Sequence, residues 1–129
     1  MRALLDTCAL VWVTTDAVRL SPEARELFKT PSNDFVVSSI SLWEIALKVK
    51  RGKMDLGISV QEYVKRLSRL SNMEILDVTP RVWLHNVALD WDHRDPTDRT
   101  IVATADLENL PIVTRDERIL RFYDRTVTA

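Results

Sequence analysis

The sequence has little cysteine, glycine or histidine, and it has no long apolar run. A lone cysteine, Cys8, excludes an internal disulfide and fits a reducing compartment. Two glycines, Gly52 and Gly57, supply neither a P-loop nor a dinucleotide-binding fingerprint. The apolar run of residues 8–13 is too short to span a bilayer, and Asp6 interrupts the opening residues too early for a signal peptide. We therefore expect a soluble cytoplasmic protein that has no membrane contact.

The composition is that of one ordinary folded domain. With 129 residues, 46% of them hydrophobic and 29% charged, the chain is long enough for a real core and too apolar for disorder. We therefore expect a single domain over residues 1–129. The net charge of −1 gives no global signature of nucleic-acid binding. Thirteen of the 18 basic residues are arginines, which mildly favours a polyanionic partner.

Apolar strand patterns alternate with helical patterns along the chain. Ser21 and Pro22 mark a helix start, and residues 60–70 repeat their apolar positions at helical spacing. Such alternation is typical of a parallel sheet covered on both faces, so we expect a three-layer α/β fold with about five strands. The expected strands cover residues 2–5, 35–37, 75–78, 112–114 and, at an edge, 126–128. The expected helices cover residues 7–13, 22–28, 39–51, 60–70, 80–89 and 95–109, with a short turn at 118–122.

Four acidic residues stand where strands end or helices begin: Asp6, Glu44, Asp98 and Asp116. In open parallel sheets these junctions share one edge, which is where ligands bind. Carboxylates crowded at that edge would repel one another and raise each other's pKa values unless a cation compensates. Oxygen ligands in this number suit Mg²⁺ or Mn²⁺. The pattern therefore indicates metal-dependent phosphoester chemistry.

Each of these acids also has a purely structural explanation. Asp6 would cap the helix that follows it, and Glu44 would complete a capping box that begins at Ser41. Asp98 and Asp116 stand in first helical turns, where acids are common. A purely structural set would mix serine, threonine, asparagine and aspartate, whereas every one of these junctions carries an acid. The joint pattern favours a metal site, which capping does not exclude.

The other reactive side chains have simpler interpretations. His85 and His93 are too far apart for a same-face helical pair, and one cysteine completes no zinc set. Both histidines are expected at the surface or in loops. Cys8 has no histidine near it in sequence and is expected to be a small buried hydrophobe.

Four tryptophans invite a base-stacking interpretation. Trp43 and Trp83 lie on apolar helical faces, so we expect them in the core. Trp12 and Trp91 are the candidates for exposed positions, where contact with a protein partner is as plausible as contact with a nucleobase.

Four motifs contain the candidate acids, and they span residues 4–7, 38–48, 93–99 and 113–117. These motifs resemble those of the PIN-domain nucleases and, within them, the VapC-type toxins of bacterial and archaeal toxin–antitoxin pairs. The likeness runs the full length, and four acid motifs in family order are far more specific than one. Cys8 stands where many relatives have histidine or serine, and Thr97 stands where phenylalanine is common. Neither change removes a carboxylate, so they bear on substrate choice more than on activity.

The resemblance implies an endoribonuclease that depends on Mg²⁺ or Mn²⁺ and leaves 5′-phosphate and 3′-hydroxyl ends. It also implies a cognate antitoxin, an RNA substrate and a homodimer. Asp95 is a less certain fifth metal ligand, because its position before Pro96 also predicts a helix cap. Thr7 and Thr114 stand where hydroxyls help to hold neighbouring acids or water. The family's acidic metal site maps onto Asp6, Glu44, Asp98 and Asp116.

Basic and apolar side chains near the acids are candidates for binding partners. Three arginines that flank the acids are candidates to bind RNA phosphates, and ion pairs with those acids are equally compatible with their positions. These are Arg94, Arg99 and Arg115. Residues 48–53 form a second basic stretch, interpreted as a solvated helix end. Leu10, Trp12 and Val13 are candidates for a groove that binds an antitoxin helix or strand.

Rival functions fit the sequence less well. A phosphoacceptor receiver domain should carry a second acid beside Asp6 and a late lysine, but no lysine follows Lys65. A phosphohydrolase with a nucleophilic Asp-x-Asp loop fails because Cys8 occupies the place of the second acid. A non-catalytic PIN module that only binds an antitoxin would typically have lost one of the four acids. The remaining alternative is a PIN-fold nuclease that acts on DNA or in RNA processing.

Overall fold

A computed structural model describes residues 1–129, and its centre is a five-stranded parallel sheet. The strand order is β3-β2-β1-β4-β5, so the first strand of the chain lies in the middle. The strands are β1 (Arg2–Leu5), β2 (Asp34–Ser38), β3 (Met73–Leu76), β4 (Ile112–Thr114) and β5 (Thr126–Thr128). The helices are α1 (Thr7–Thr15), a 3-10 turn η1 (Ala17–Arg19), α2 (Pro22–Lys29), α3 (Ser39–Lys50), α4 (Val60–Ser68), α5 (Pro80–Ala88), α6 (Pro96–Glu108) and α7 (Glu117–Phe122).

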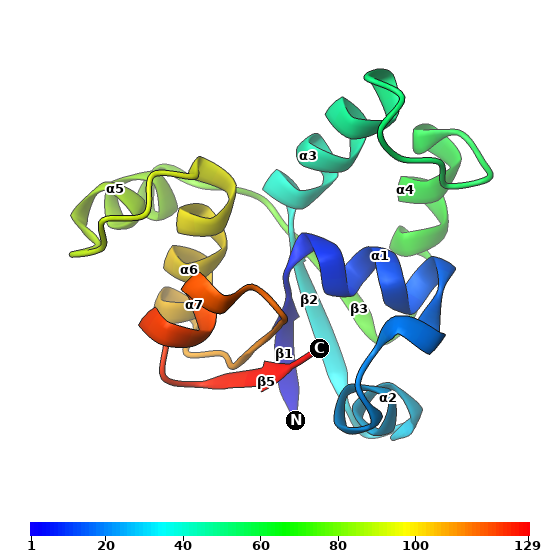
Figure 1. The fold of residues 1–129 in the computed structure, drawn as a ribbon, viewed down its shortest axis with the longest axis horizontal. Coiled ribbons are helices and arrows are strands. Elements are labelled where there is room, and N and C mark those ends of the chain that lie inside the picture. The colour runs from blue at the N-terminus through cyan, green and yellow to red at the C-terminus, as the bar shows by residue number, and fades with distance from the viewer.

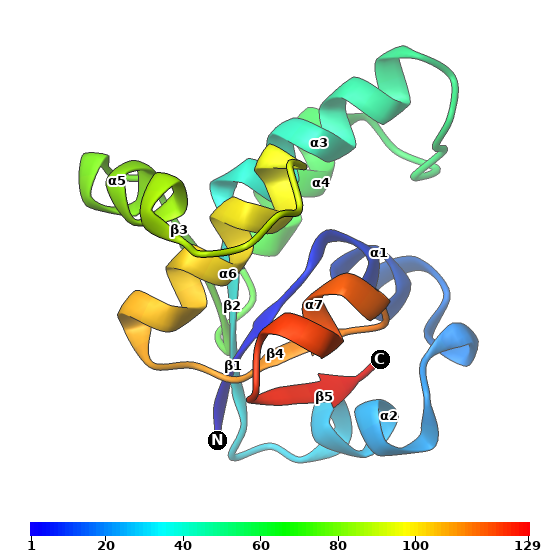
Figure 2. The ribbon, with the colours of Figure 1, turned by 60° about the vertical axis from the view of Figure 1, so that its left-hand side comes forward.

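The two faces of the sheet carry separate cores. Side chains alternate along β1, so Ala3 and Leu5 join one cluster while Leu4 joins the other. The cluster around Leu5 packs beneath α1, α2 and α4, and the cluster around Leu4 packs against α6 and α7. Figures 1 and 2 show these helices on opposite sides of the strands, with α5 outside α6. The central strands are apolar at nearly every position because both of their faces are buried.

The expected fold class is confirmed, and one strand is displaced from its expected place. The strand expected at residues 75–78 is β3, two residues earlier in the chain. Its register pairs Val36 with Glu74 and Ser38 with Leu76, so pairing ends where β2 ends. Beyond it, the Val78 amide donates to the Ser39 hydroxyl at 3.1 Å, which ties the connection to the start of α3.

Several expectations about burial are wrong. Trp43 and Trp83 are 55% and 44% exposed, because the apolar faces on which they lie have no neighbouring element over them. Cys8 is exposed at the second position of α1 instead of being a buried hydrophobe. Leu10, expected in a partner groove, is fully buried in the core. None of the helices combines the length and the apolar character needed to cross a membrane.

Candidate metal centre in an acidic cleft

A cleft of about 830 Å³ lies where the carboxyl ends of β1 and β4 meet the helices that follow them. Asp6 follows β1 directly, Asp116 follows β4 at a distance of two residues, and Glu44 lies on the helix after β2. Three chain segments far apart in sequence therefore deliver carboxylates to one edge, as the parallel topology requires. The acids that line the cleft include all those proposed from sequence: Asp6, Glu44, Asp95, Asp98 and Asp116.

Three of the cleft acids are helix N-caps. The Asp6 carboxylate accepts from the Ala9 amide at 2.8 Å at the start of α1. Asp95 caps α6 by accepting from the Thr97 amide at 2.8 Å, and Asp116 caps α7 in the same way. The positive ends of three helix dipoles therefore converge on the cleft and stabilise negative charge there. Capping fixes the carboxylates in place without neutralising them.

Glu44 is held differently from what its sequence position suggested. The N-cap of α3 is Ser38, whose hydroxyl accepts from the Ile40 amide at 3.2 Å, and Glu44 lies in the second turn. Ser41 is buried and accepts a hydrogen bond from the Thr7 hydroxyl at 2.9 Å, so these two side chains join α1 to α3. The contact gives Thr7 a role in holding the two walls of the cleft together. No capping box therefore explains the acid at position 44.

Thr114 connects two of the acids. Its hydroxyl donates to Asp6 Oδ2 at 2.5 Å and accepts from the Asp116 amide at 3.0 Å, and its side chain is fully buried. Burial raises the pKa of Asp6 from 3.8 to about 6, against the opposing effect of the hydrogen bond from Thr114. Charges on Asp98 and Asp116 raise that pKa further. Burial also raises the pKa of Asp98. These shifts show that the cleft holds negative charge at a cost that a bound cation would relieve.

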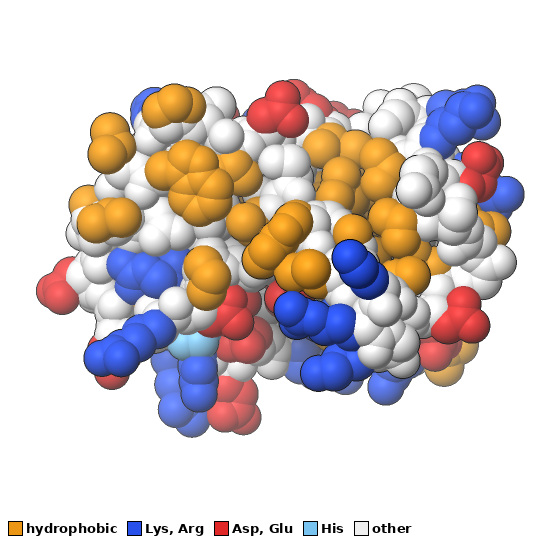
Figure 3. All heavy atoms as spheres, turned by 90° about the horizontal axis from the view of Figure 1, so that it is seen from above, with side chains coloured by type: hydrophobic (Ala, Val, Ile, Leu, Met, Phe, Trp, Pro, Cys, Tyr) orange, Lys and Arg blue, Asp and Glu red, His pale blue; other side chains and the backbone are white.

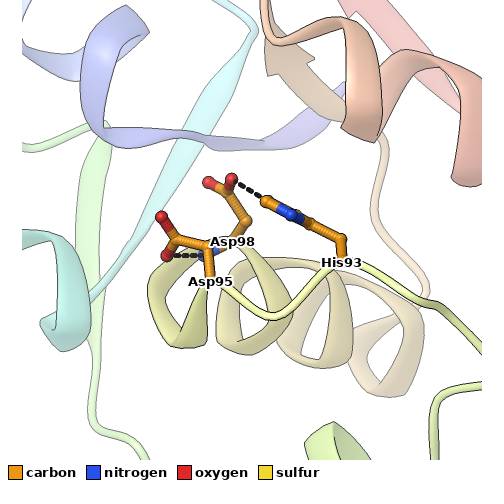
Figure 4. A group of neighbouring side chains, drawn as sticks. All are labelled: His93, Asp95 and Asp98. Atoms are coloured by element: carbon orange, nitrogen blue, oxygen red, sulfur yellow. Dashed lines mark hydrogen bonds and ion pairs between the residues drawn. The ribbon is translucent and has the colours of Figure 1, made fainter.

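His93 is the functional candidate that sequence reasoning missed. It lies in a loop, as expected, but its side chain is only 7% exposed, and its Nε2 is 2.7 Å from Asp98 Oδ2. Figure 4 shows the ring pointing at the Asp98 carboxylate beside Asp95. One ligand atom from each of these three residues lies within 4.8 Å of the others. The available signal was the short spacing from His93 to Asp98 across the Pro96 helix start.

The three flanking arginines have three different surroundings. All five N–H groups of Arg99 are used: they bond the Asn86 side chain and four backbone carbonyls, at 2.6 to 3.3 Å. Arg99 therefore holds the loop before α6, which is neither the expected phosphate contact nor an ion pair. Arg115 lines the cleft, donates to carbonyls of Ala129 and Arg19, and lies over the Trp12 ring at 4.6 Å. The third, Arg94, is exposed and lines a neighbouring hollow of about 630 Å³.

The cleft also has a basic rim and an apolar wall. The basic residues that line it come from η1, α3, the loop after α3 and the segment after β4. Two of them belong to the basic stretch interpreted from sequence as a solvated helix end. In the space-filling view, acidic side chains lie between groups of basic side chains (Figure 3). The rim comprises Arg19, Lys48, Lys53 and Arg115, and the apolar wall comprises Val11, Trp12 and Met54.

Comparisons with known proteins agree with this geometry. The PIN domain family model matches residues 3–125. Ribonuclease VapC22 of Mycobacterium tuberculosis (strain ATCC 25618 / H37Rv) is 30% identical over 117 residues, which is 90% of this chain and 88% of the relative. A toxin–antitoxin complex from Klebsiella pneumoniae contains a chain with a TM-score of 0.65 and 25% identity, covering 98% and 96% of the two chains. VapBC2 from Rickettsia felis, bound to a DNA fragment from its promoter, gives a TM-score of 0.71 at 20% identity over 99% and 98%.

Proposed function

Because this chain belongs to the PIN-domain family, we propose that it is a divalent-metal-dependent endoribonuclease and the toxin of a toxin–antitoxin pair. The observation that carries the proposal is the gathering of seven carboxylates, five of them proposed from sequence, and four basic side chains in one cleft. A ribonuclease that is 30% identical over 90% of the chain supports RNA as the substrate. The likeness to a toxin–antitoxin complex at 25% identity supports the toxin role.

The donor set fits a hard divalent cation. Carboxylate oxygens are the ligands that Mg²⁺ and Mn²⁺ take, and the cleft offers no thiolate ligand set, because the chain has one cysteine. When bound, such a cation lowers the pKa of water and stabilises charge on the scissile phosphate. Asp95 would serve as a fifth, outer member of the set. The residues that would hold the cation are Asp6, Glu44, Asp98 and Asp116.

The chain's own side chains would orient the acids and the substrate. Thr114 holds the Asp6 carboxylate and the backbone of Asp116 in one arrangement, so these two acids keep a fixed relation. Lys48 and Lys53 line the same cleft as Arg115 and would bind RNA phosphates beside the acids. Arg94, together with Arg118 and Arg121 in the neighbouring hollow, would continue this phosphate track. We propose that the protein acts in the cytoplasm.

We propose two protein partners from the apolar surfaces of the molecule. Val11, Trp12 and Met54 give the cleft an apolar wall that suits an antitoxin segment, with an antitoxin arginine reaching the acids. A second hollow of about 210 Å³ adjoins the cleft, because Thr15 lines both of them, and the lining of this hollow is mainly apolar. A homodimer would cover the exposed apolar face of α5. That face carries Trp83, Leu84 and Val87, which are 44%, 74% and 81% exposed.

The alternatives differ in substrate or in the loss of chemistry. A PIN-fold nuclease that acts on DNA or in RNA processing would use the same acids, and the groove around them would decide the substrate. A non-catalytic antitoxin-binding module has no need for uncompensated carboxylates, and the retention of all four acids disfavours it.

Cleavage of RNA by the purified chain tests the proposal. The wild type with Mg²⁺ or Mn²⁺ is expected to cut RNA at discrete sites, and chelation by EDTA or the change Asp6→Ala should abolish cutting. Glu74→Gln, which alters a surface carboxylate paired with Arg2, serves as the matched control and should cut like the wild type. Equal cutting by wild type and Asp6→Ala would refute the site, and cutting of DNA alone would move the proposal to the DNA-directed alternative.

A further inference from the structure

His93 is held on both sides by side chains from the helices that border the cleft. Its Nε2 lies 2.7 Å from Asp98 Oδ2 on α6, and its Nδ1 lies 3.0 Å from the Nη1 of Arg118 on α7. The His93 side chain is 7% exposed, so water competes little for the contact with Asp98, whereas Arg118 approaches from the exposed side. Both ring nitrogens are therefore committed to a partner within the protein.

Arg118 decides which ring nitrogen carries the hydrogen. A guanidinium has N–H donors and no acceptor, so His93 Nδ1 must accept the hydrogen bond from it. The ring then carries its hydrogen on Nε2, which donates to the Asp98 carboxylate. We propose that His93 is a positioning residue that holds Asp98 through Nε2–H, with Arg118 fixing that tautomer. This inference rests on the proposed function, in which Asp98 is a metal ligand.

The same geometry argues against His93 as a metal ligand. His93, Asp95 and Asp98 are close enough together to suggest a ligand set. A ring nitrogen binds a cation only through its lone pair, and Nε2 bears a hydrogen while the Nδ1 lone pair accepts from Arg118. The arrangement matches the outer partners that orient ligating carboxylates, not the ligands themselves.

A rigid surround keeps His93 in place. The Trp91 ring meets the His93 ring edge-on at 4.9 Å and stacks on Phe122 at 4.5 Å with 10° between the ring planes. Arg99 donates to the backbone carbonyls of both Trp91 and His93 at 2.6 and 3.0 Å. Phe122 lies on α7, as Arg118 does, so that helix fixes both the ring position and its hydrogen.

A second histidine–aspartate pair, whose aspartate also lies on α6, is a matched control. His85 Nε2 lies 2.6 Å from Asp106 Oδ2, and their side chains are 31% and 51% exposed. This pair joins α5 to α6 on the outer side, away from the cleft residues, and its Nδ1 has no partner among the side chains. Changes at His85 therefore test the loss of a histidine–aspartate contact without touching the cleft.

The tautomer is measured directly by long-range ¹H–¹⁵N NMR of the imidazoles in the metal-free protein. The chain has two histidines, so the His85→Gln variant assigns both sets of signals. We expect His93 to show a hydrogen-bearing Nε2 and an unprotonated Nδ1, and we expect Arg118→Met to shift it toward a mixture of tautomers. A hydrogen on Nδ1 of His93 in the wild type would overturn the proposal. This readout does not depend on nuclease activity.

Mn²⁺ binding, followed by electron paramagnetic resonance, tests the consequence for Asp98. His93→Leu is expected to weaken Mn²⁺ binding about 10- to 100-fold, the usual effect of losing an outer partner of a ligand. His93→Gln places an amide donor where Nε2–H was and should recover most of that loss, while His85→Leu should change nothing. Circular dichroism confirms that each variant is folded.

The outcomes separate the two proposals. If Asp98→Asn weakens Mn²⁺ binding but His93→Leu does not, the role of His93 is refuted and the proposed function stands. If the wild type binds no Mn²⁺ in the cleft and cuts no RNA, the proposed function itself fails. If His93→Leu does not fold, the NMR comparison of wild type and Arg118→Met still decides the tautomer.

Discussion

Carboxylates inside the cleft and carboxylates outside it have different surroundings. Outside, four acids each contact a basic side chain within 3.3 Å, and most of these side chains are well exposed. Inside, the carboxylates of Asp6 and Asp116 take their hydrogen bonds from amides or a hydroxyl, and Asp98 takes one from His93. The outer acids and their partners are Glu74 with Arg2, Glu62 with Arg66, Asp106 with His85 and Glu117 with Arg121.

We infer from this difference a separate role for each group of acids. An exposed ion pair contributes at most about 1 kcal/mol to stability and neutralises its own charge. Asp6, Asp95 and Asp116 are oriented by amide and hydroxyl donors, which fix their geometry but leave their charge in place. Negative charge that is positioned and uncompensated is what a divalent cation requires. The two groups should therefore respond in opposite ways to substitution, to metal and to pH.

The largest difference is expected in catalysis. Asp98→Asn should lower RNA cleavage at least about 100-fold, because it removes a charge at the proposed metal site, whereas Asp106→Asn on the same helix should change it less than about twofold. Both aspartates contact a histidine, so the two variants remove the same kind of contact and differ only in whether the acid lies in the cleft. Rates of cleavage of one RNA under saturating Mg²⁺ give the comparison. Equal losses of cleavage rate in the two variants would contradict the distinction between cleft acids and outer acids.

Metal binding should stabilise the fold through the cleft acids alone. At a Mn²⁺ concentration 100 times the dissociation constant, the wild type should gain about 2.7 kcal/mol of unfolding free energy. Asp6→Asn should lose most of this gain, and Glu74→Gln should keep all of it, because the pair with Arg2 is remote from the cleft. Urea denaturation with and without Mn²⁺ measures the gain. A gain that persists in Asp6→Asn would place the cation elsewhere.

Without metal, the stability of the protein should fall as the pH rises. The pKa of Asp6 is raised from 3.8 to about 6, so the folded state binds a proton between these values that the unfolded state releases. The unfolding free energy should therefore decrease from about pH 4 to about pH 6, by on the order of 2 kcal/mol from Asp6, and level off above. Asp6→Asn should remove this part of the slope. Denaturation curves across this range in a chelator measure it, and identical slopes in both proteins would contradict the account.

The smallest effect is expected for an outer ion pair. Glu74→Gln breaks the 2.7 Å contact with Arg2, whose side chain is 41% exposed. The expected loss of unfolding free energy is about 0.5 kcal/mol, and it should shrink at high salt because screening weakens exposed pairs. A loss above about 2 kcal/mol would mean that the outer acids carry more of the stability than this comparison allows.

Much of the fold was predictable from sequence because its signals are local. Helix starts such as Ser21-Pro22 and Asp95-Pro96, and apolar strands such as residues 2–5, identify the elements, and their alternation identifies the parallel sheet. The acids lie at one edge because the carboxyl ends of parallel strands and the helix starts that follow them share that edge. The end of β3 was misplaced because it depends on the length of β2, which is a property of the pairing and not of residues 75–78.

The parts that sequence missed depend on distant contacts. The role proposed for His93 depends on Arg118, 25 residues later, and no residue in the loop indicates that contact. Arg99 resembled a phosphate ligand until the fold surrounded it with backbone carbonyls. Trp43 and Trp83 carry the pattern of core residues, but a helical pattern does not state whether the element that covers it belongs to the same chain.

The position of bound Mn²⁺ tests the central claim most directly. Anomalous diffraction from crystals of the protein soaked in Mn²⁺ locates the cation without reference to activity. The account predicts density within ligand distance of Asp6 and Asp98, and none at the outer pair of His85 and Asp106. Density at the outer pair, or none in the cleft at a Mn²⁺ concentration that supports RNA cleavage, would contradict it.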